Sequence, residues 1–112
     1  MSLSIHIHDG VHSQPANGVL VTVSPDLGHQ HAESITGRAG EDGVFVCPDL
    51  VLVQPAAVMY QITIGVEGYF ATFGMSSPQR EFTLLLRVPD AARDCHVRSL
   101  ITPSAQMTHY HF

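Results

Sequence analysis

The chain has 112 residues, of which 45% are hydrophobic and only 13% are charged, and its formal net charge is −5. It contains no lysine, so no basic stripe is available for nucleic acid, and no apolar run approaches the roughly 20 residues of a membrane-spanning helix. We therefore expect a single domain over residues 1–112, with neither nucleic acid nor a membrane as partner. The low charged fraction also indicates a surface that another subunit covers.

The N-terminal residues 1–9 lack the basic and continuous apolar regions of a secretory signal, so a cytoplasmic location is expected. Cys47 and Cys95 are isolated cysteines without C-x-x-C spacing. We expect both to be buried, reduced thiols; a disulfide or a zinc pair is the alternative.

Short β-type runs follow one another along the chain, separated by Gly, Pro, Asn and Asp. Alternation of apolar and polar residues over 3–9 and 59–66, together with short β-type runs between turn residues elsewhere, predicts strands over residues 3–9, 19–24, 33–38, 44–47, 59–66, 82–88, 97–102 and 106–111. Residues 14–18 and 40–43 are predicted turns, the second because Asp-Gly favours positive φ. Residues 25–31 and 48–57 are predicted loops, and the spacing of Tyr69, Phe70 and Phe73 predicts one helical turn. About eight short strands with one helical turn indicate an all-β, antiparallel β-sandwich.

Histidine is abundant, with eight residues of this type, and several stand two positions from another polar residue. In a strand, residues i and i+2 project from one face, so each such pair shares a face. The pairs are His6 and His8, His96 and Arg98, and His109 and His111. His12, His29 and His31 are expected at the surface.

Two kinds of chemistry fit these pairs, beside the simpler interpretation of hydrogen-bonded, half-buried histidines. Zinc accepts two imidazoles from one strand face when further ligands converge, so His6, His8, His96, His109 and His111 are candidate ligands. Alternatively, a histidine pair can activate water and protonate a leaving nitrogen, while an adjacent arginine holds an anionic or carbonyl-rich substrate. No G-x-S-x-G elbow or Gly-rich phosphate loop supports serine-nucleophile or nucleotide chemistry.

Several segments resemble the transthyretin-like proteins, which include 5-hydroxyisourate hydrolase. Residues 3–9 (LSIHIHD) and 14–23 (QPANGVLVTV) resemble the start of that family. Residues 41–43 (EDG), 60–64 (YQITI), 68–70 (GYF) and 95–97 (CHV) follow in the same order and at matching spacing. The resemblance covers nearly the whole chain.

This resemblance implies a transthyretin-like, eight-stranded antiparallel β-sandwich with one short helix. It also implies a homotetramer, a dimer of dimers, with a central channel lined by the C-terminal tetrapeptide. The similar hydrolase opens a strained lactam by adding water, with two histidines and an arginine and without a cofactor. His6 and His96 match the two histidines, and no cofactor or metal is expected.

The chain departs from the family on the substrate side of this site. Val44 stands where the arginine is expected, Arg98 replaces a proline, and the terminal Tyr-Arg-Gly-Ser is replaced by residues 109–112 (HYHF). Because Arg98 shares a strand face with His96, it is predicted to replace the missing guanidinium. The predicted catalytic residues are His6, His96 and Arg98, and the predicted substrate-binding residues are His8, His109, Tyr110, His111 and Phe112.

Two classes of function remain open at this point. Retention of both histidines favours a hydrolase acting on 5-hydroxyisourate or on a related small heterocycle. Loss of the expected arginine and of the tail motif favours a non-catalytic member that binds a small molecule in its channel, or a structural homotetramer.

Overall fold

The computed structural model describes residues 3–25, 34–47, 59–87 and 94–111. Within these ranges the chain forms nine strands and one helix. In chain order they are β1 (Leu3–Asp9), β2 (Gln14–Pro15), β3 (Leu20–Pro25), β4 (Ile35–Arg38), β5 (Val44–Cys47), β6 (Met59–Gly65), α2 (Val66–Ala71), β7 (Phe82–Arg87), β8 (Cys95–Ile101) and β9 (Gln106–His111).

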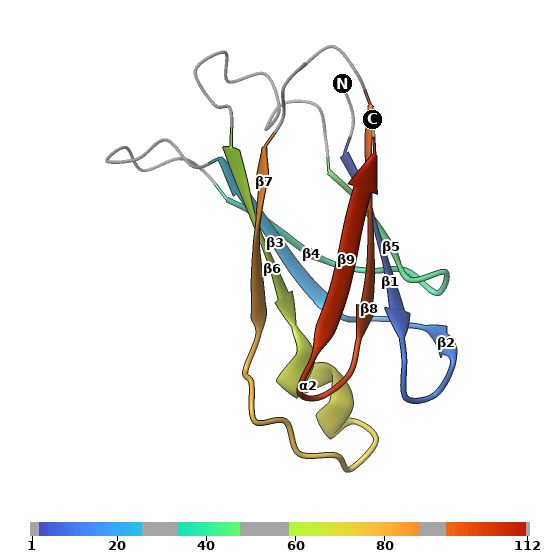
Figure 1. Ribbon diagram of the computed structural model, residues 1–112. Coiled ribbons are helices and arrows are strands. Elements are labelled where there is room, and N and C mark those ends of the chain that lie inside the picture. The colour runs from blue at the N-terminus through green and yellow to red at the C-terminus, as the bar shows by residue number, and fades with distance from the viewer. Residues whose placement is uncertain (1–2, 26–33, 48–58, 88–93, 112) are drawn as a thin grey trace.

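The strands form two sheets that face each other (Figure 1). One sheet has the order β2-β1-β8-β9, with β5 also paired to β1, and the other has the order β4-β3-β6-β7. All pairs are antiparallel except β1 with β8, which run parallel over their whole length, from Leu3 opposite Cys95 to Asp9 opposite Ile101. The beginning and the end of the chain are therefore neighbours in one sheet.

Alternation along the strands separates the core from the outer surface. In β1, Leu3, Ile5 and Ile7 are at most 2% exposed, while the side chains between them point away from the core. Val21 and Val23 of β3 and corresponding residues of β6 and β8 complete the apolar layer between the sheets. Burial of one such side chain contributes roughly 1.5–3 kcal/mol, so the register of each strand is strongly specified.

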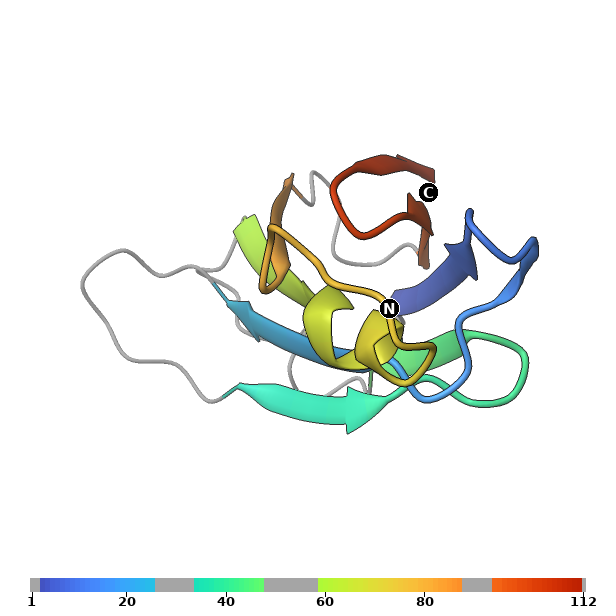
Figure 2. The same cartoon turned by 90° about the horizontal axis from the view of Figure 1, so that it is seen from below.

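The helix α2 lies at one end of the sandwich, between the ends of the two sheets (Figures 1 and 2). Val66, Tyr69 and Phe70 are its buried residues. The Tyr69 hydroxyl donates a 2.8 Å hydrogen bond to a carboxylate oxygen of Asp9, the last residue of β1. The helix is thereby tied to the strand that carries His6 and His8.

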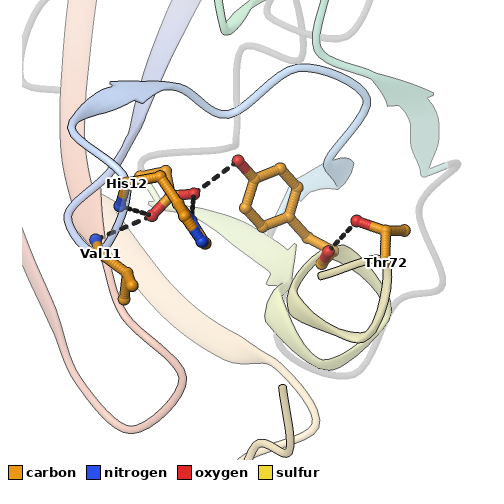
Figure 3. A network of polar contacts seen from close by, with 5 residues as sticks. Val11, His12 and Thr72 are labelled. Carbon is orange, nitrogen blue, oxygen red and sulfur yellow. Dashed lines mark hydrogen bonds and ion pairs between the residues drawn. The ribbon is translucent and has the colours of Figure 1, made fainter. Parts of the chain in front are cut away.

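Asp9 is fully buried and also organises the turn that follows β1. Its carboxylate accepts hydrogen bonds from the backbone N–H groups of Val11 and His12, the two labelled residues of this turn in Figure 3, and it contacts His12 Nδ1 at 2.6 Å. Burial alone would raise the pKa of Asp9, but the bonds from His12, Tyr69 and Val11 outweigh burial and lower the pKa below its ordinary value of 3.8.

The turn between β4 and β5 depends on a glycine, as predicted from Asp42-Gly43. Gly43 has a φ of 74°, and a side chain there would collide with the carbonyl oxygen of Ile7. The Gly43 carbonyl in turn accepts a 2.8 Å hydrogen bond from the Ile7 N–H. This close approach places Asp42 beside the outer face of β1.

The predicted β-sandwich with a short helix is confirmed, with several differences in detail. β3 lies one residue later than predicted, β4 begins at Ile35, and β8 ends at Ile101, one residue before its predicted end. The sandwich contains one parallel pair of strands. Residues 14 and 15, predicted as part of a turn, form the short additional strand β2. β8 begins at Cys95, two residues earlier than predicted, because its pairing with β1 starts there. The helix spans 66–71 and includes Val66, which was predicted to end a strand. Some predictions fall outside the described residues: the loop at 48–57, most of the loop at 25–31, and the positions of His29 and His31.

No helix within the described ranges is long and apolar enough to cross a membrane.

Candidate active site

One surface carries most of the polar residues that the sequence singled out. It is the outer face of the strands β1, β8 and β9, which we call the histidine face. Its residues alternate with buried or inward-facing neighbours along each strand. They are Ser4, His6 and His8 from β1, His96 and Arg98 from β8, and His109 and His111 from β9.

Strand register arranges these residues in rows. His6 lies opposite Arg98, which lies opposite His109, and Ser4 lies opposite His96, which lies opposite His111. Neighbouring strands are about 4.8 Å apart, so side chains in one row are within contact distance. Residues separated by some ninety positions in sequence are therefore brought together by the β1–β8 pair.

The Ser4 hydroxyl joins the two histidines that the sequence analysis assigned to catalysis. Its oxygen lies 2.8 Å from Nδ1 of His96 and 3.3 Å from Nε2 of His6. The centroids of the two imidazole rings are 6.1 Å apart, and the rings are tilted by 44°. His111 stacks on the other side of His96, with ring centroids 5.2 Å apart and an interplanar angle of 23°.

The surroundings of His6 favour its neutral form. Burial lowers the pKa of His6 below its ordinary value of 6.5, and the charge of Arg98 and the neighbouring His96 lower it further. Asp42 opposes them and raises the pKa, with a smaller effect than these three. A neutral imidazole at neutral pH can accept a proton from water, which is the property required of a general base.

A groove of about 430 Å³ lies over part of the histidine face. Its lining includes His6, His8, Arg98 and His109, all of them predicted site residues. It also includes Leu100 and Met107, which are 42% and 71% exposed, and Asp42 and Pro15 from the turns beside β1. The groove therefore combines a guanidinium and imidazoles with an apolar side and one carboxylate, and its volume suits a small molecule.

Asp42 was not among the predicted site residues. Its carboxylate accepts a 3.1 Å hydrogen bond from the Val44 N–H, which explains its role in the predicted turn. Nothing local to this turn indicates that Asp42 itself borders the groove, because that placement depends on the pairing of β5 with β1. The arginine position expected at Val44, directly after the turn, was the one sign that this part of the chain lies near the site.

Three other candidate residues have distinct positions. Val44 lies opposite His6 across the β5–β1 pair, so an apolar side chain stands where the guanidinium was expected. Tyr110 lies opposite the buried Val97 and lines a second pocket with Ile62, on the face of β9 opposite His109 and His111. Phe112 lies outside the described residues.

The positions of the described residues also test two alternatives left open by the sequence, a metal site and a disulfide. Among the described residues, no three His, Cys, Asp or Glu side chains are placed to hold a metal ion together. Cys47 and Cys95 are both buried, and no disulfide joins them. They lie on opposite sides of Leu3, in β5 and β8, and two strand spacings exceed the roughly 7 Å limit between Cα atoms of a disulfide.

Comparison with solved structures identifies close structural neighbours. A transthyretin from Sparus aurata superposes with a TM-score of 0.78 at 18% sequence identity, covering 96% of this chain and 94% of that chain. Sea bream transthyretin in complex with thyroxine gives the same TM-score at 19% identity, covering 96% of this chain and 92% of that chain. No protein-family model and no curated protein matches the sequence. The chain therefore has a transthyretin-like fold.

Proposed function

We propose that this protein is a cofactor-free hydrolase that opens a strained cyclic amide, either 5-hydroxyisourate or a related small heterocycle. The observation that carries the proposal is the pair of imidazoles of His6 and His96, joined through the Ser4 hydroxyl, with Arg98 in register beside His6. The resemblance noted in the sequence supplies the substrate class.

In the proposed reaction, His6 removes a proton from a water molecule as the water oxygen attacks the substrate carbonyl carbon. The C–N bond of the cyclic amide then breaks, and the leaving nitrogen receives a proton from His96. Arg98 donates hydrogen bonds to the oxygen on which negative charge develops, and donors of this kind stabilise such transition states strongly. No cofactor is required, because water is the only co-reactant.

The remaining residues of the histidine face are proposed to bind the substrate. His8 and His109 border the groove, and His111 stacks on His96. Tyr110 points from the opposite face of β9, so a direct contact with the same substrate is not part of the proposal. Phe112 remains a candidate from its place in the C-terminal tetrapeptide.

We further propose that the protein is a homotetramer, a dimer of dimers, with the histidine face turned toward a central channel. Large apolar side chains on the outer surfaces of both sheets support self-association: Val46, Leu85 and Met107 are each about 60–70% exposed. Sedimentation velocity would test this assembly, and a monomer at micromolar concentration would contradict it. The cytoplasmic location expected from the sequence is retained as part of the proposal.

The enzymatic proposal is tested by mixing the purified protein with freshly generated 5-hydroxyisourate and following its ultraviolet decay. We expect decay well above the spontaneous rate, and losses of about 10²-fold or more in His6→Gln and His96→Gln. His12→Gln is the matched control, because His12 lies outside the histidine face and binds Asp9. A spontaneous rate with correctly folded protein would contradict the proposal.

The second candidate function is non-catalytic binding of a small molecule. Two observations favour it: Val44 stands opposite His6 where an arginine was expected, and one structural neighbour was solved in complex with thyroxine. Isothermal titration with thyroxine tests it directly. Saturable binding by a protein that does not accelerate the decay of 5-hydroxyisourate would favour this function over hydrolysis.

A further inference from the structure

We infer that Ser4 is the central link of a proton relay between His6 and His96, in addition to holding the two rings in place. The inference rests on the proposed hydrolysis and assigns a role to a residue that the sequence analysis did not consider. It depends on which nitrogen of each ring the Ser4 oxygen contacts, and these differ: Nε2 of His6 and Nδ1 of His96.

Strand pairing places Ser4 beside both histidines. Ser4 is two residues from His6 on the same face of β1, and it is the register partner of His96 across the parallel pair. It is half-buried, as are both histidines. Among the described residues, the charged or titratable groups that act on His6 are Arg98, His96, Asp42 and His111, and His111 also stacks on His96.

A serine hydroxyl carries a single proton, which restricts the protonation of its two neighbours. If the hydroxyl donates to Nδ1 of His96, it accepts from Nε2–H of His6, and both neutral rings then carry their proton on Nε2. If the donation runs the other way, both rings carry their proton on Nδ1. In either arrangement the two rings have the same tautomer.

The same tautomer has opposite consequences for the two ring nitrogens that do not contact Ser4, namely Nδ1 of His6 and Nε2 of His96. With both protons on Nε2, the free nitrogen of His6 is Nδ1, which has a lone pair and can act as a base. The free nitrogen of His96 is Nε2, which carries a proton and can act as an acid. The Ser4 bridge therefore provides one base and one acid from two chemically identical side chains.

The relay accounts for every proton in the reaction. Nδ1 of His6 takes a proton from the attacking water, and Nε2 of His6 passes its own proton to the Ser4 oxygen. The Ser4 hydroxyl proton moves to Nδ1 of His96, and Nε2 of His96 gives its proton to the leaving nitrogen as the C–N bond breaks. Both rings end neutral with the proton on Nδ1, so the site has taken one proton from water and given a different one to the product, and neither imidazole is left charged. The two rings return to the starting tautomer by proton exchange with solvent before the next turnover.

Kinetics of Ser4 variants test the relay. Ser4→Ala removes the hydroxyl, and we expect kcat to fall by about 10²-fold with little change in KM, because Ser4 is not among the described residues that line the groove. Ser4→Thr keeps a hydroxyl on a strand residue and should retain most of kcat. Thr22→Ala is the matched control, since it removes a cross-strand hydroxyl contact with Thr36 in the other sheet. Wild-type kcat in Ser4→Ala, or equal losses in Ser4→Ala and Ser4→Thr, would overturn the relay.

Long-range ¹H–¹⁵N spectra of the imidazoles give a second test that needs no substrate. At a pH where both rings are neutral, we expect His6 and His96 to have the same tautomer in the wild-type protein and to lose this correlation in Ser4→Ala. Unlike tautomers in the wild type would overturn the bridge. If the wild-type protein opens no cyclic amide, the proposed function fails, and the spectra alone decide whether Ser4 joins the two rings.

Discussion

His6 and Arg98 are register partners across the parallel pair of β1 and β8, and both border the same groove. Ninety-one intervening residues separate them in sequence, yet the sheet places them about one strand spacing apart. This relationship makes Arg98 the guanidinium nearest in register to the proposed base, and it defines the first prediction.

We expect Arg98→Ala to lower kcat/KM by about 10²-fold, because a donor that stabilises developing negative charge commonly contributes this much. Arg87→Ala is the matched control: Arg87 is an exposed arginine of β7, in the other sheet. Turnover of 5-hydroxyisourate is the measurement. Equal kcat/KM in the wild type and in Arg98→Ala would show that Arg98 has no role in the proposed reaction.

The acid limb of the pH–rate profile provides a second prediction. Since burial, Arg98 and His96 lower the pKa of His6, the base stays neutral to a pH below 6.5, and activity should fall only as the pH drops through this lowered pKa. Arg98→Gln removes one lowering cause, so its acid limb should move toward higher pH. The measurement is the pH dependence of kcat/KM for both proteins. An acid limb at the same pH in the wild type and in Arg98→Gln would show that His6 is not the group whose titration limits activity.

The bounds of β1, β5 and β9 could be predicted from the sequence because Gly, Pro or Ser residues flank these short strands, and in β1 apolar and polar residues also alternate regularly. The groove could not, because it depends on which strands are neighbours. Nothing local indicates that β1 pairs in parallel with β8, or that the turn at Asp42 lies beside His8. Arg98 could be predicted from its spacing to His96, whereas Ser4 carries no such signal, because its sequence position is that of an ordinary polar residue in an alternating strand.

Tyr110 shows how register decides between neighbouring residues. The C-terminal tetrapeptide was predicted to bind substrate as a unit, but a strand sends alternate residues to opposite faces. His109 and His111 therefore lie on the histidine face, and Tyr110 lies over Val97 on the other.

This alternation gives a third prediction. His109→Ala should raise KM for 5-hydroxyisourate several-fold, because His109 borders the groove. Tyr110→Ala changes the neighbouring residue of β9 and should leave KM unchanged, because Tyr110 lies on the opposite face of the strand. Steady-state kinetics of both variants, with thermal unfolding as a check on folding, provide the comparison. A larger effect of Tyr110→Ala on KM would contradict the placement of the substrate on the histidine face.

The bond between Tyr69 and Asp9 leads to a prediction about stability. Tyr69→Phe removes the 2.8 Å hydrogen bond to a buried carboxylate, and such bonds to charged groups contribute about 1.5–3 kcal/mol. We expect a loss of that order in the free energy of unfolding at neutral pH, measured with urea. Phe73→Leu is the control for packing, since Phe73 lies just beyond the helix and its ring contacts Tyr69 and His12 without itself bonding Asp9. An unchanged free energy in Tyr69→Phe would show that this bond does not hold the helix to β1.

The pH dependence of this stability has a defined sign. A carboxyl whose folded pKa is lowered contributes stability above its unfolded pKa, here 3.8, and loses it as the pH falls through the folded pKa. Tyr69 is one of the groups that lower the pKa of Asp9, so Tyr69→Phe should lose stability at a higher pH than the wild type. Coincident acid-unfolding midpoints would contradict this.

The last prediction uses the pairing of His6 with Val44. Val44 stands beside His6 on the side of β1 away from Arg98, so an arginine there would approach the proposed base from β5. We expect Val44→Arg to restore much of the activity lost in Arg98→Ala, because either guanidinium can then reach the developing oxyanion. Val46→Arg is the matched control: Val46 is on the same face of β5, but it lies opposite Ser4. A double variant, Val44→Arg with Arg98→Ala, that stays as slow as Arg98→Ala alone would show that the two positions do not serve the same substrate atom.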